Sequence, residues 1–155
     1  LSYKCPKLRG TVIIRYDVES EEETMKIEHV AIWTTQLEAL KDFYATHFSA
    51  QAAAPKYVNP KRQFESYFLT FPDGGARLEI MRVPSLANLH QEGGVHSVGY
   101  AHIAISVGSK EAVDDITAAL RQAGIPVLDG PRMTGDGYYE TLVLDPDGNR
   151  VEITV

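Results

Sequence analysis

The 155-residue sequence contains a single cysteine, Cys5, so it cannot form an internal disulfide bond. One unpaired cysteine is typical of proteins in a reducing cytosol. No apolar run approaches the roughly 18 residues that a membrane-spanning helix requires, and the first residues lack the apolar stretch of a signal peptide. These absences predict a cytoplasmic protein that has no contact with a membrane.

Basic residues are also few. The chain has 15 Lys and Arg against 21 Asp and Glu, a formal net charge of −6 and a pI near 5.3. Without a cluster of basic side chains to neutralise phosphates, nucleic acid is not an expected partner. The length and a hydrophobic content of 44% suit one compact domain with a single core.

One short pattern occurs twice in the chain, His-(Val/Ile)-Ala-Ile followed at a distance by (Leu/Val)-Glu-Ile. The first copy contains His29 and Glu79, and the second contains His102 and Glu152. The two histidines are 102 − 29 = 73 positions apart, and the two glutamates are 152 − 79 = 73 positions apart. This agreement indicates an internal duplication that carries two His/Glu pairs.

Each copy is expected to contain a strand, a helix and three further strands. The sequence predicts these elements at 27–34, 35–48, 51–59, 64–71 and 76–83 in the first copy, and at 99–107, 109–124, 126–128, 138–144 and 150–155 in the second. Thr35 and Glu38 match a capping box at the first helix. Ser109 is the expected N-cap of the second, and Gly124 its stop.

The two copies define the expected domain organisation. Residues 1–24 do not fit the repeat and form an N-terminal extension before Met25. The rest, 25–155, is one domain composed of module one (26–83), a connector (84–98) and module two (99–155).

Strand alternation gives the His/Glu pairs a geometry. In each strand the aliphatic residues fall on one face, which the helices can cover, and the His or Glu falls on the other. If the two modules form one curved sheet, His29, Glu79, His102 and Glu152 meet in a pocket on its concave side. Two imidazoles and two carboxylates suit nickel, zinc, cobalt, iron or manganese rather than a soft metal. Open coordination positions would permit Lewis-acid catalysis.

These residues, both helices and both Asp-Gly hairpins resemble the vicinal oxygen chelate superfamily, which includes glyoxalases, bleomycin-resistance proteins and dioxygenases. The resemblance covers about residues 26–155. It implies an α+β fold of two tandem βαβββ modules that form a curved mixed sheet with the helices on its outer face. It also implies a divalent metal ion, a small-molecule substrate and a homodimer.

The ligand set is similar to that of glyoxalase I, residue by residue. That resemblance implies a lyase or isomerase reaction on a small α-oxo carbonyl compound, or on its hemithioacetal with a thiol, through an enediolate. Glu152 or Glu79 would be the base, with Glu152 slightly favoured. Ring-cleaving dioxygenases and thiol transferases of the superfamily use two His and one Glu, which argues against them. Acyl-CoA epimerases, which typically carry Gln in place of Glu79, and small-molecule binding or resistance proteins of the same fold stay as alternatives.

Candidate substrate contacts lie outside the repeat pattern. A glycine-rich loop at 130–139 is placed to act as a lid, and within it Arg132 could bind a carboxylate and Tyr138 could contact substrate. Tyr67 could line the pocket from the first module. Whether one chain closes its own pocket or two chains exchange modules stays open, because the connector permits either.

Overall fold

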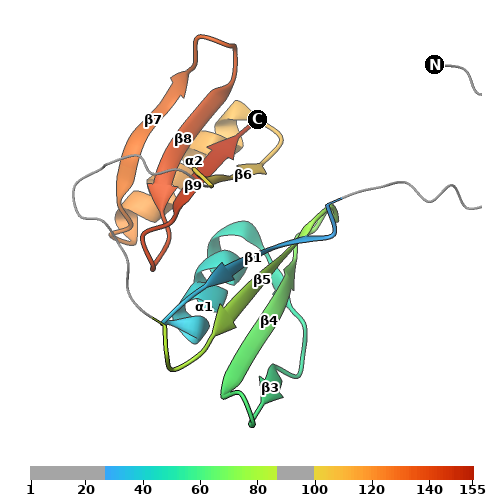
Figure 1. Cartoon of the computed structure of the whole chain (residues 1–155). Helices are drawn as coiled ribbons and strands as arrows, with labels where there is room; N and C mark the ends of the chain where they lie inside the picture. Colours follow the sequence, from blue (N-terminus) through green and yellow to red (C-terminus); the bar gives the residue numbers. More distant parts are fainter. Residues whose placement is uncertain (1–26, 87–99) are drawn as a thin grey trace, which may run out of the picture.

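The computed structural model describes residues 27–86 and 100–155. The predicted extension 1–24 and most of the predicted connector 84–98 lie outside these residues. The described parts form an α+β fold of two repeated modules with one helix each, as predicted (Figure 1). Neither described helix is long and apolar enough to span a membrane.

Module one is built around a mixed sheet with the order β1-β5-β4-β2, and β3 also pairs with β4. Its strands are β1 (His29–Trp33), β2 (Gln51–Ala52), β3 (Tyr57–Asn59), β4 (Phe64–Thr70) and β5 (Arg77–Arg82), and its helix is α1 (Leu37–Phe48). β1 and β5 run parallel, and the other pairs are antiparallel. The weakly patterned stretch after α1 therefore supplies two short strands instead of one.

Module two repeats this arrangement in a separate sheet with the order β6-β9-β8-β7. Its strands are β6 (Ile103–Ser106), β7 (Val127–Met133), β8 (Tyr139–Leu144) and β9 (Arg150–Thr154), and its helix is α2 (Lys110–Gln122). β6 is parallel to β9, as β1 is to β5. The duplication read from the sequence is therefore also a duplication of topology.

The two sheets are not joined. Within the described ranges no strand of module one pairs with a strand of module two, and β1 and β6 are edge strands of their own sheets. The single curved sheet expected from the sequence is therefore divided into two within this chain. Strand alternation fixes which side chains share a face of one sheet, but it does not determine how two sheets meet.

Aliphatic side chains cover one face of each sheet and pack under its helix, as the alternation predicted. In module one, Val30 pairs with Leu78 and Ile32 with Ile80, beneath α1. The predicted apolar stripe of α1 is buried throughout; its members are Leu37, Leu40, Phe43, Tyr44 and Phe48. In module two, Val113 and Leu120 of α2 are fully buried against Val143, Val151 and Ile153.

The turn between β8 and β9 of module two contacts the start of α1 in module one. Asp147 accepts a hydrogen bond from the hydroxyl of Thr34, and the Gln36 side chain donates to the carbonyl of Pro146 at 3.0 Å. The buried Tyr44 hydroxyl donates to Asp145 at 3.4 Å. Burial raises the pKa of the Asp145 carboxyl, although hydrogen bonds from Asn149 oppose the shift. The junction thus depends on polar groups removed from water, which must stay paired.

The predicted capping box of α1 is wrong. The N-cap residue is Gln36, whose side chain makes no capping bond, and Thr34 rather than Thr35 accepts from the Gln36 backbone. Glu38 turns outward and forms ion pairs with Lys41 and Lys56. Thr34 takes this position because its hydroxyl also donates to Asp147 of the other module. A tertiary contact therefore overrides the local sequence pattern.

The cap of α2 is as predicted, since the Ser109 hydroxyl accepts from the backbone of Ala112 at 3.1 Å. Replacing Ser109 by alanine is expected to lower the free energy of unfolding by about 1 kcal/mol. The matched change Thr35→Ala removes a hydroxyl that makes no cap and should cost less than about 0.5 kcal/mol. Urea denaturation followed by circular dichroism measures both. Equal losses in the two variants would contradict this assignment of the caps.

Candidate metal centre

The first His/Glu pair lies on the face of module one that α1 does not cover. His29 begins β1, and Glu79 in β5 pairs in register with Ala31. Since Ala31 and His29 lie two residues apart in one strand, their side chains share a face. His29 Nε2 is 3.9 Å from Glu79 Oε2, and the side chains are 39% and 15% exposed.

The second pair has the same construction in module two. His102 immediately precedes β6, and Glu152 in β9 pairs in register with Ala104. His102 Nε2 is 3.3 Å from Glu152 Oε2, with side-chain exposures of 40% and 18%. The two modules therefore present equivalent His/Glu pairs on equivalent open faces, as the 73-residue offset predicted.

Each pair has the chemistry and spacing of half a metal site. Ligand atoms about 2.1 Å from a common ion lie roughly 3.0 to 3.4 Å apart in tetrahedral or octahedral geometry. The second pair meets this spacing as it stands, and the first requires a small side-chain movement. The two pairs do not come together in one chain: no group of three or more His, Cys, Asp or Glu side chains suited to a metal occurs among the described residues. The expected four-residue cluster is therefore present here as two halves.

Partners around His29 hold its ring in place. His29 Nδ1 lies 2.5 Å from Oε2 of Glu28, and the Arg77 guanidinium binds the other oxygen of that carboxylate. These contacts, that with His29 foremost, hold the pKa of the Glu28 carboxyl below its usual value. Phe68 meets the imidazole edge-on, with ring centres 5.4 Å apart. With Nδ1 engaged by a carboxylate, Nε2 remains directed towards Glu79.

A second carboxylate beside the His102/Glu152 pair was missed by the sequence analysis. Glu140 in β8 pairs with Thr154, and Leu142, two residues on, pairs with Glu152, so Glu140 and Glu152 share the open face. Burial and the negative charge of Glu152 raise the pKa of the Glu140 carboxyl. The alternation of β8 could have revealed this residue, but it lies outside the repeated motif.

The structure places Tyr67 away from the His/Glu pairs. It pairs in register with Ile80 and so lies on the face covered by α1. Its hydroxyl donates to the Glu38 carboxylate at 3.3 Å, and Lys41 and Lys56 lie over its ring. Tyr67 is thus part of the contact between helix and sheet on the other side of the sheet from Glu79.

The predicted lid at 130–139 is shorter than expected. β7 continues through Met133, and Arg132 pairs with Glu140, which leaves Thr134 to Tyr138 as the connecting turn. Gly130 has φ +82°, and a Cβ there would lie 2.5 Å from the carbonyl oxygen of Glu140. The glycine therefore permits close pairing of β7 with β8. In the sequence alone, the same glycine looks like part of a loop.

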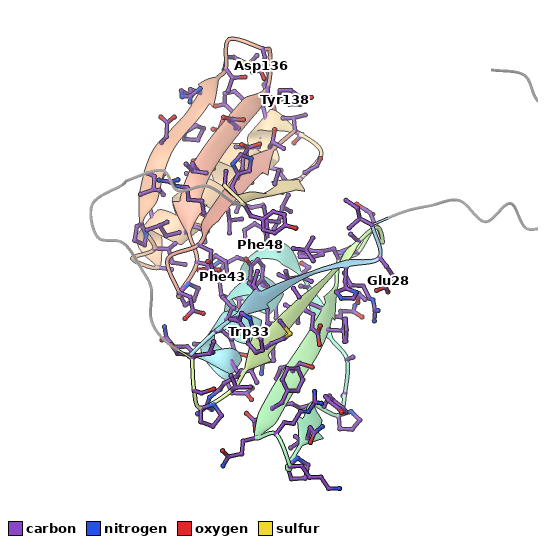
Figure 2. The ribbon with its side chains drawn as sticks, viewed as in Figure 1. Glu28, Trp33, Phe43, Phe48, Asp136 and Tyr138 are labelled. Carbon is purple, nitrogen blue, oxygen red and sulfur yellow. The ribbon has the colours of Figure 1, made fainter. Side chains whose placement is uncertain are left out.

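The other two predicted substrate contacts fall in different places. Register places Arg132 on the same face as Glu140 and Glu152, and its guanidinium is held by Asp129, with Nε to Oδ2 at 2.8 Å. Tyr138 is 54% exposed at the turn between β7 and β8, near Asp136 at the outer tip of module two (Figure 2). Arg132 thus shares the face of the second pair, and Tyr138 projects from its margin.

The open face of module one also carries exposed aromatic side chains. Trp33 (Figure 2) is 50% exposed and meets Phe64 edge-on. Tyr57, 57% exposed, contacts the same Phe64 ring. Clustered apolar side chains beside a polar pair are typical of a surface that a ligand or another protein surface covers.

A sequence comparison identifies the family. The model of the Glyoxalase/Bleomycin resistance protein/Dioxygenase superfamily matches residues 26–153. Among characterised proteins, the chain is similar to biphenyl-2,3-diol 1,2-dioxygenase 2 of Rhodococcus globerulus, with 27% identity over 139 residues. The match covers 85% of this chain and 63% of the dioxygenase, so the chain spans less than two thirds of that relative.

Solved structures show the same fold. A glyoxalase family protein of Enterococcus faecalis superposes with a TM-score of 0.67 at 24% identity, covering 84% of this chain and 97% of that protein. The trypanothione-dependent glyoxalase I of Leishmania major superposes with a TM-score of 0.65 at 22% identity, covering 84% and 86% of the two chains. At these identities the likeness concerns the fold.

Proposed function

Because the chain belongs to the glyoxalase/bleomycin resistance protein/dioxygenase superfamily, we propose that it is a metal-dependent enzyme of glyoxalase I type. Its metal ligands would be His29, Glu79, His102 and Glu152. The observation that carries this proposal is the equivalence of the two half-sites: each histidine faces its glutamate across a parallel strand pair at the same register. Solvent-facing polar residues without a shared role have no reason to repeat in this way.

A second copy of the chain would complete the site. The two pairs lie in separate sheets, and no group of three ligand-type side chains forms among the described residues. Each pair also lies on a sheet face without a helix, and module one has exposed aromatic residues there. Placing module one of one chain over module two of another would bring four ligands together and cover Trp33. We therefore propose a homodimer with two shared sites.

The residues of the chain have distinct roles in the proposed reaction. When bound, a divalent ion would supply Lewis-acid stabilisation of negative charge on substrate oxygens. Glu152 or Glu79 would move a proton between adjacent carbons of an α-oxo carbonyl compound or its hemithioacetal, by way of an enediolate. Glu152 is the preferred base, and Arg132 on the same face would orient an anionic group of the substrate. Trp33 and Phe68 would exclude water from the enediolate.

Metal binding and activity test this proposal together. Purified protein should bind close to one divalent ion per chain by mass spectrometry, and the metal-loaded protein should form thioester from methylglyoxal and glutathione in an ultraviolet assay. Glu79→Gln and Glu152→Gln should weaken metal binding. The proposal fails if the protein holds no metal, or if both variants hold it as tightly as the wild type. If metal binds without thioester formation, the acyl-CoA epimerase alternative takes precedence for the substrate.

Oxidative ring cleavage of a catechol is the second candidate, favoured by the likeness to the Rhodococcus globerulus dioxygenase. The fourth ligand-type residue argues against it, because open positions are needed for oxygen and substrate on a two-His, one-carboxylate iron site. Incubation of the iron(II)-loaded protein with biphenyl-2,3-diol in air separates the candidates. Oxygen consumption with loss of the catechol would favour the dioxygenase, and its absence alongside thioester formation would favour the isomerase. A metal-free binding protein would show neither activity.

Glu28 offers a test of the first half-site. Glu28→Gln removes the charged partner of His29 Nδ1 while it preserves side-chain shape, so metal affinity should fall about tenfold. Isothermal titration with Zn²⁺ measures the loss. The matched control Glu111→Gln, at an exposed position in the first turn of α2, should leave the affinity unchanged. Equal affinities in Glu28→Gln and the wild type would show that Glu28 does not position the ring.

A further inference from the structure

The junction between the modules has two halves related by the duplication, and they differ. In one half, the turn of module two docks on module one: Asp147 accepts hydrogen bonds from the Thr34 hydroxyl and from the Gln36 side chain. The modules pack tightly at this half of the junction, since Tyr44 beneath the turn is fully buried.

The other half brings the turn of module one towards module two. This turn has the same Pro-Asp-Gly sequence as its counterpart, but displaced by one position: Asp73 and Asp147 are 147 − 73 = 74 positions apart, so the repeat offset places Gly74 opposite Asp147. Val107, 73 positions after Thr34, is the counterpart of Thr34 in module two. A valine side chain has no hydrogen-bond donor. Within the part of the chain that the structure describes, Asp73 makes no side-chain hydrogen bond or ion pair. The Asp73 carboxylate thus lacks a contact with the other module of the kind that Asp147 makes.

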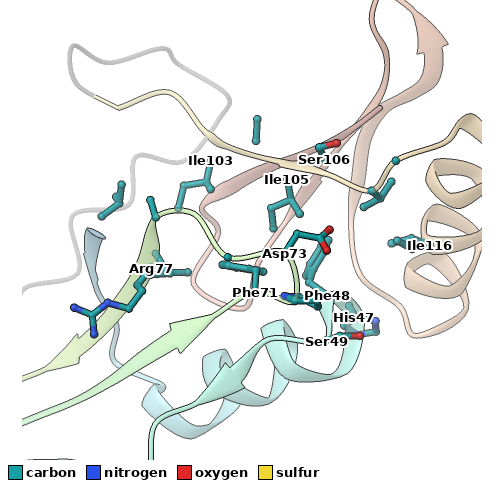
Figure 3. Close-up of a pocket in the computed structure, with 18 of the residues that line it drawn as sticks. His47, Phe48, Ser49, Phe71, Asp73, Arg77, Ile103, Ile105, Ser106 and Ile116 are labelled. Carbon is teal, nitrogen blue, oxygen red and sulfur yellow. The ribbon is translucent and has the colours of Figure 1, made fainter. Parts of the chain in front are cut away.

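A cleft of about 830 Å³ lies at this second half. Its walls are mainly apolar and come from α1, the β4–β5 turn, β6 and α2; they include Phe48, Phe71, Ile103, Ile105, Val107 and Ile116. Figure 3 shows Asp73 projecting between Ile105 and Phe48. None of the four His/Glu residues of the candidate metal centre lines it. Small-molecule sites have this size, with apolar walls and few polar groups.

The charges around the cleft favour a cation. The Arg77 guanidinium points away from Asp73 (Figure 3) and is bound to Glu28 over the Phe68 ring. Partial burial lowers the pKa of His47, the other basic residue of the lining, and so disfavours its charged form. Asp73 therefore carries the uncompensated charge of the cleft, and the nearby rings of Phe48 and Phe71 also favour a cation.

We propose that this cleft binds a small molecule with an apolar body of one or two rings and a single protonated amine. The amine pairs with Asp73, and the apolar body packs between Phe48 and Ile105. The site does not depend on the metal centre. A ligand here contacts both modules, and so it stabilises their arrangement as well as occupying the cleft.

Three probes of the same shape and different charge test the proposal: 1-naphthylmethylamine, 1-naphthalenemethanol and 1-naphthoic acid. Isothermal titration of the full chain at pH 7 should give about three- to tenfold tighter binding of the amine than of the alcohol, as expected for a partly exposed ion pair, and the weakest binding for the acid. Asp73→Asn should abolish the preference for the amine while the alcohol still binds. Val107→Trp, which fills the cleft, should weaken amine and alcohol alike.

Asp136→Asn is the matched control, because it removes the same charge from the far tip of module two (Figure 2); it should keep the preference for the amine. Circular dichroism of all variants establishes that they are folded. The proposal is overturned if amine and alcohol bind the wild type equally, if none of the probes binds at millimolar concentration, or if Asp73→Asn retains the preference. A second copy or another segment of the chain filling the cleft would produce the absence of binding.

Discussion

Replacing Glu152 by glutamine is expected to lower kcat for thioester formation by about 10³-fold, because the amide cannot accept a carbon-bound proton. The same change removes a charged ligand and leaves His102, 3.3 Å away in the wild type, as the remaining member of the second half-site. Stopped-flow or steady-state ultraviolet assays at saturating metal separate the loss of chemistry from the loss of metal.

Two comparisons sharpen this test. Glu79→Gln should reduce metal affinity and have a smaller effect on kcat once metal is saturating, if Glu152 is the base. Glu111→Gln on the exposed side of α2 should match the wild type. A Glu152→Gln enzyme with kcat within about twofold of the wild type would exclude this carboxylate as the base.

Truncating Leu40 to alanine is expected to lower the free energy of unfolding by about 2 to 5 kcal/mol. The side chain is fully buried in the contact between α1 and the sheet of module one. Its loss leaves a cavity beneath the strands that hold His29 and Glu79, so metal affinity should fall as well. Guanidinium denaturation measures the stability change.

Leu128→Ala is the matched control, since Leu128 is 48% exposed at β7 and the same atoms removed from a wet surface should cost less than about 1 kcal/mol. If Leu40→Ala costs no more than Leu128→Ala, the packing described for α1 is wrong.

The module structure could be predicted from the sequence because two independent periodicities agree. The 73-residue offset identified equivalent residues, and strand alternation assigned each of them to a face. His29 and Glu79 share an open face because the strand parity that buries Val30 and Leu78 requires it. Their spacing within each half-site follows from the parallel register of the two strands.

Local pattern failed where a distant contact decided the outcome. Thr34 was not recognised as the residue that bonds the start of α1, because its partner Asp147 lies 113 positions away. Gly130 looked like part of a loop, but its lack of a side chain permits the close pairing of β7 and β8. The two sheets are separate within the described residues, and the alternation within a repeat does not specify how the two modules meet.

The shared site is tested most directly by mixing two variants that each lack one half-site. One carries His29→Ala and Glu79→Gln, the other His102→Ala and Glu152→Gln, and each has its own affinity tag, so that mixed dimers can be purified from cells that express both. If the site is shared between chains, each variant alone should bind metal weakly and be inactive. The mixed dimer should then regain one of its two sites, with about half of the wild-type metal and activity per dimer. A mixed dimer that binds no more metal than either variant alone would contradict a site shared between two chains.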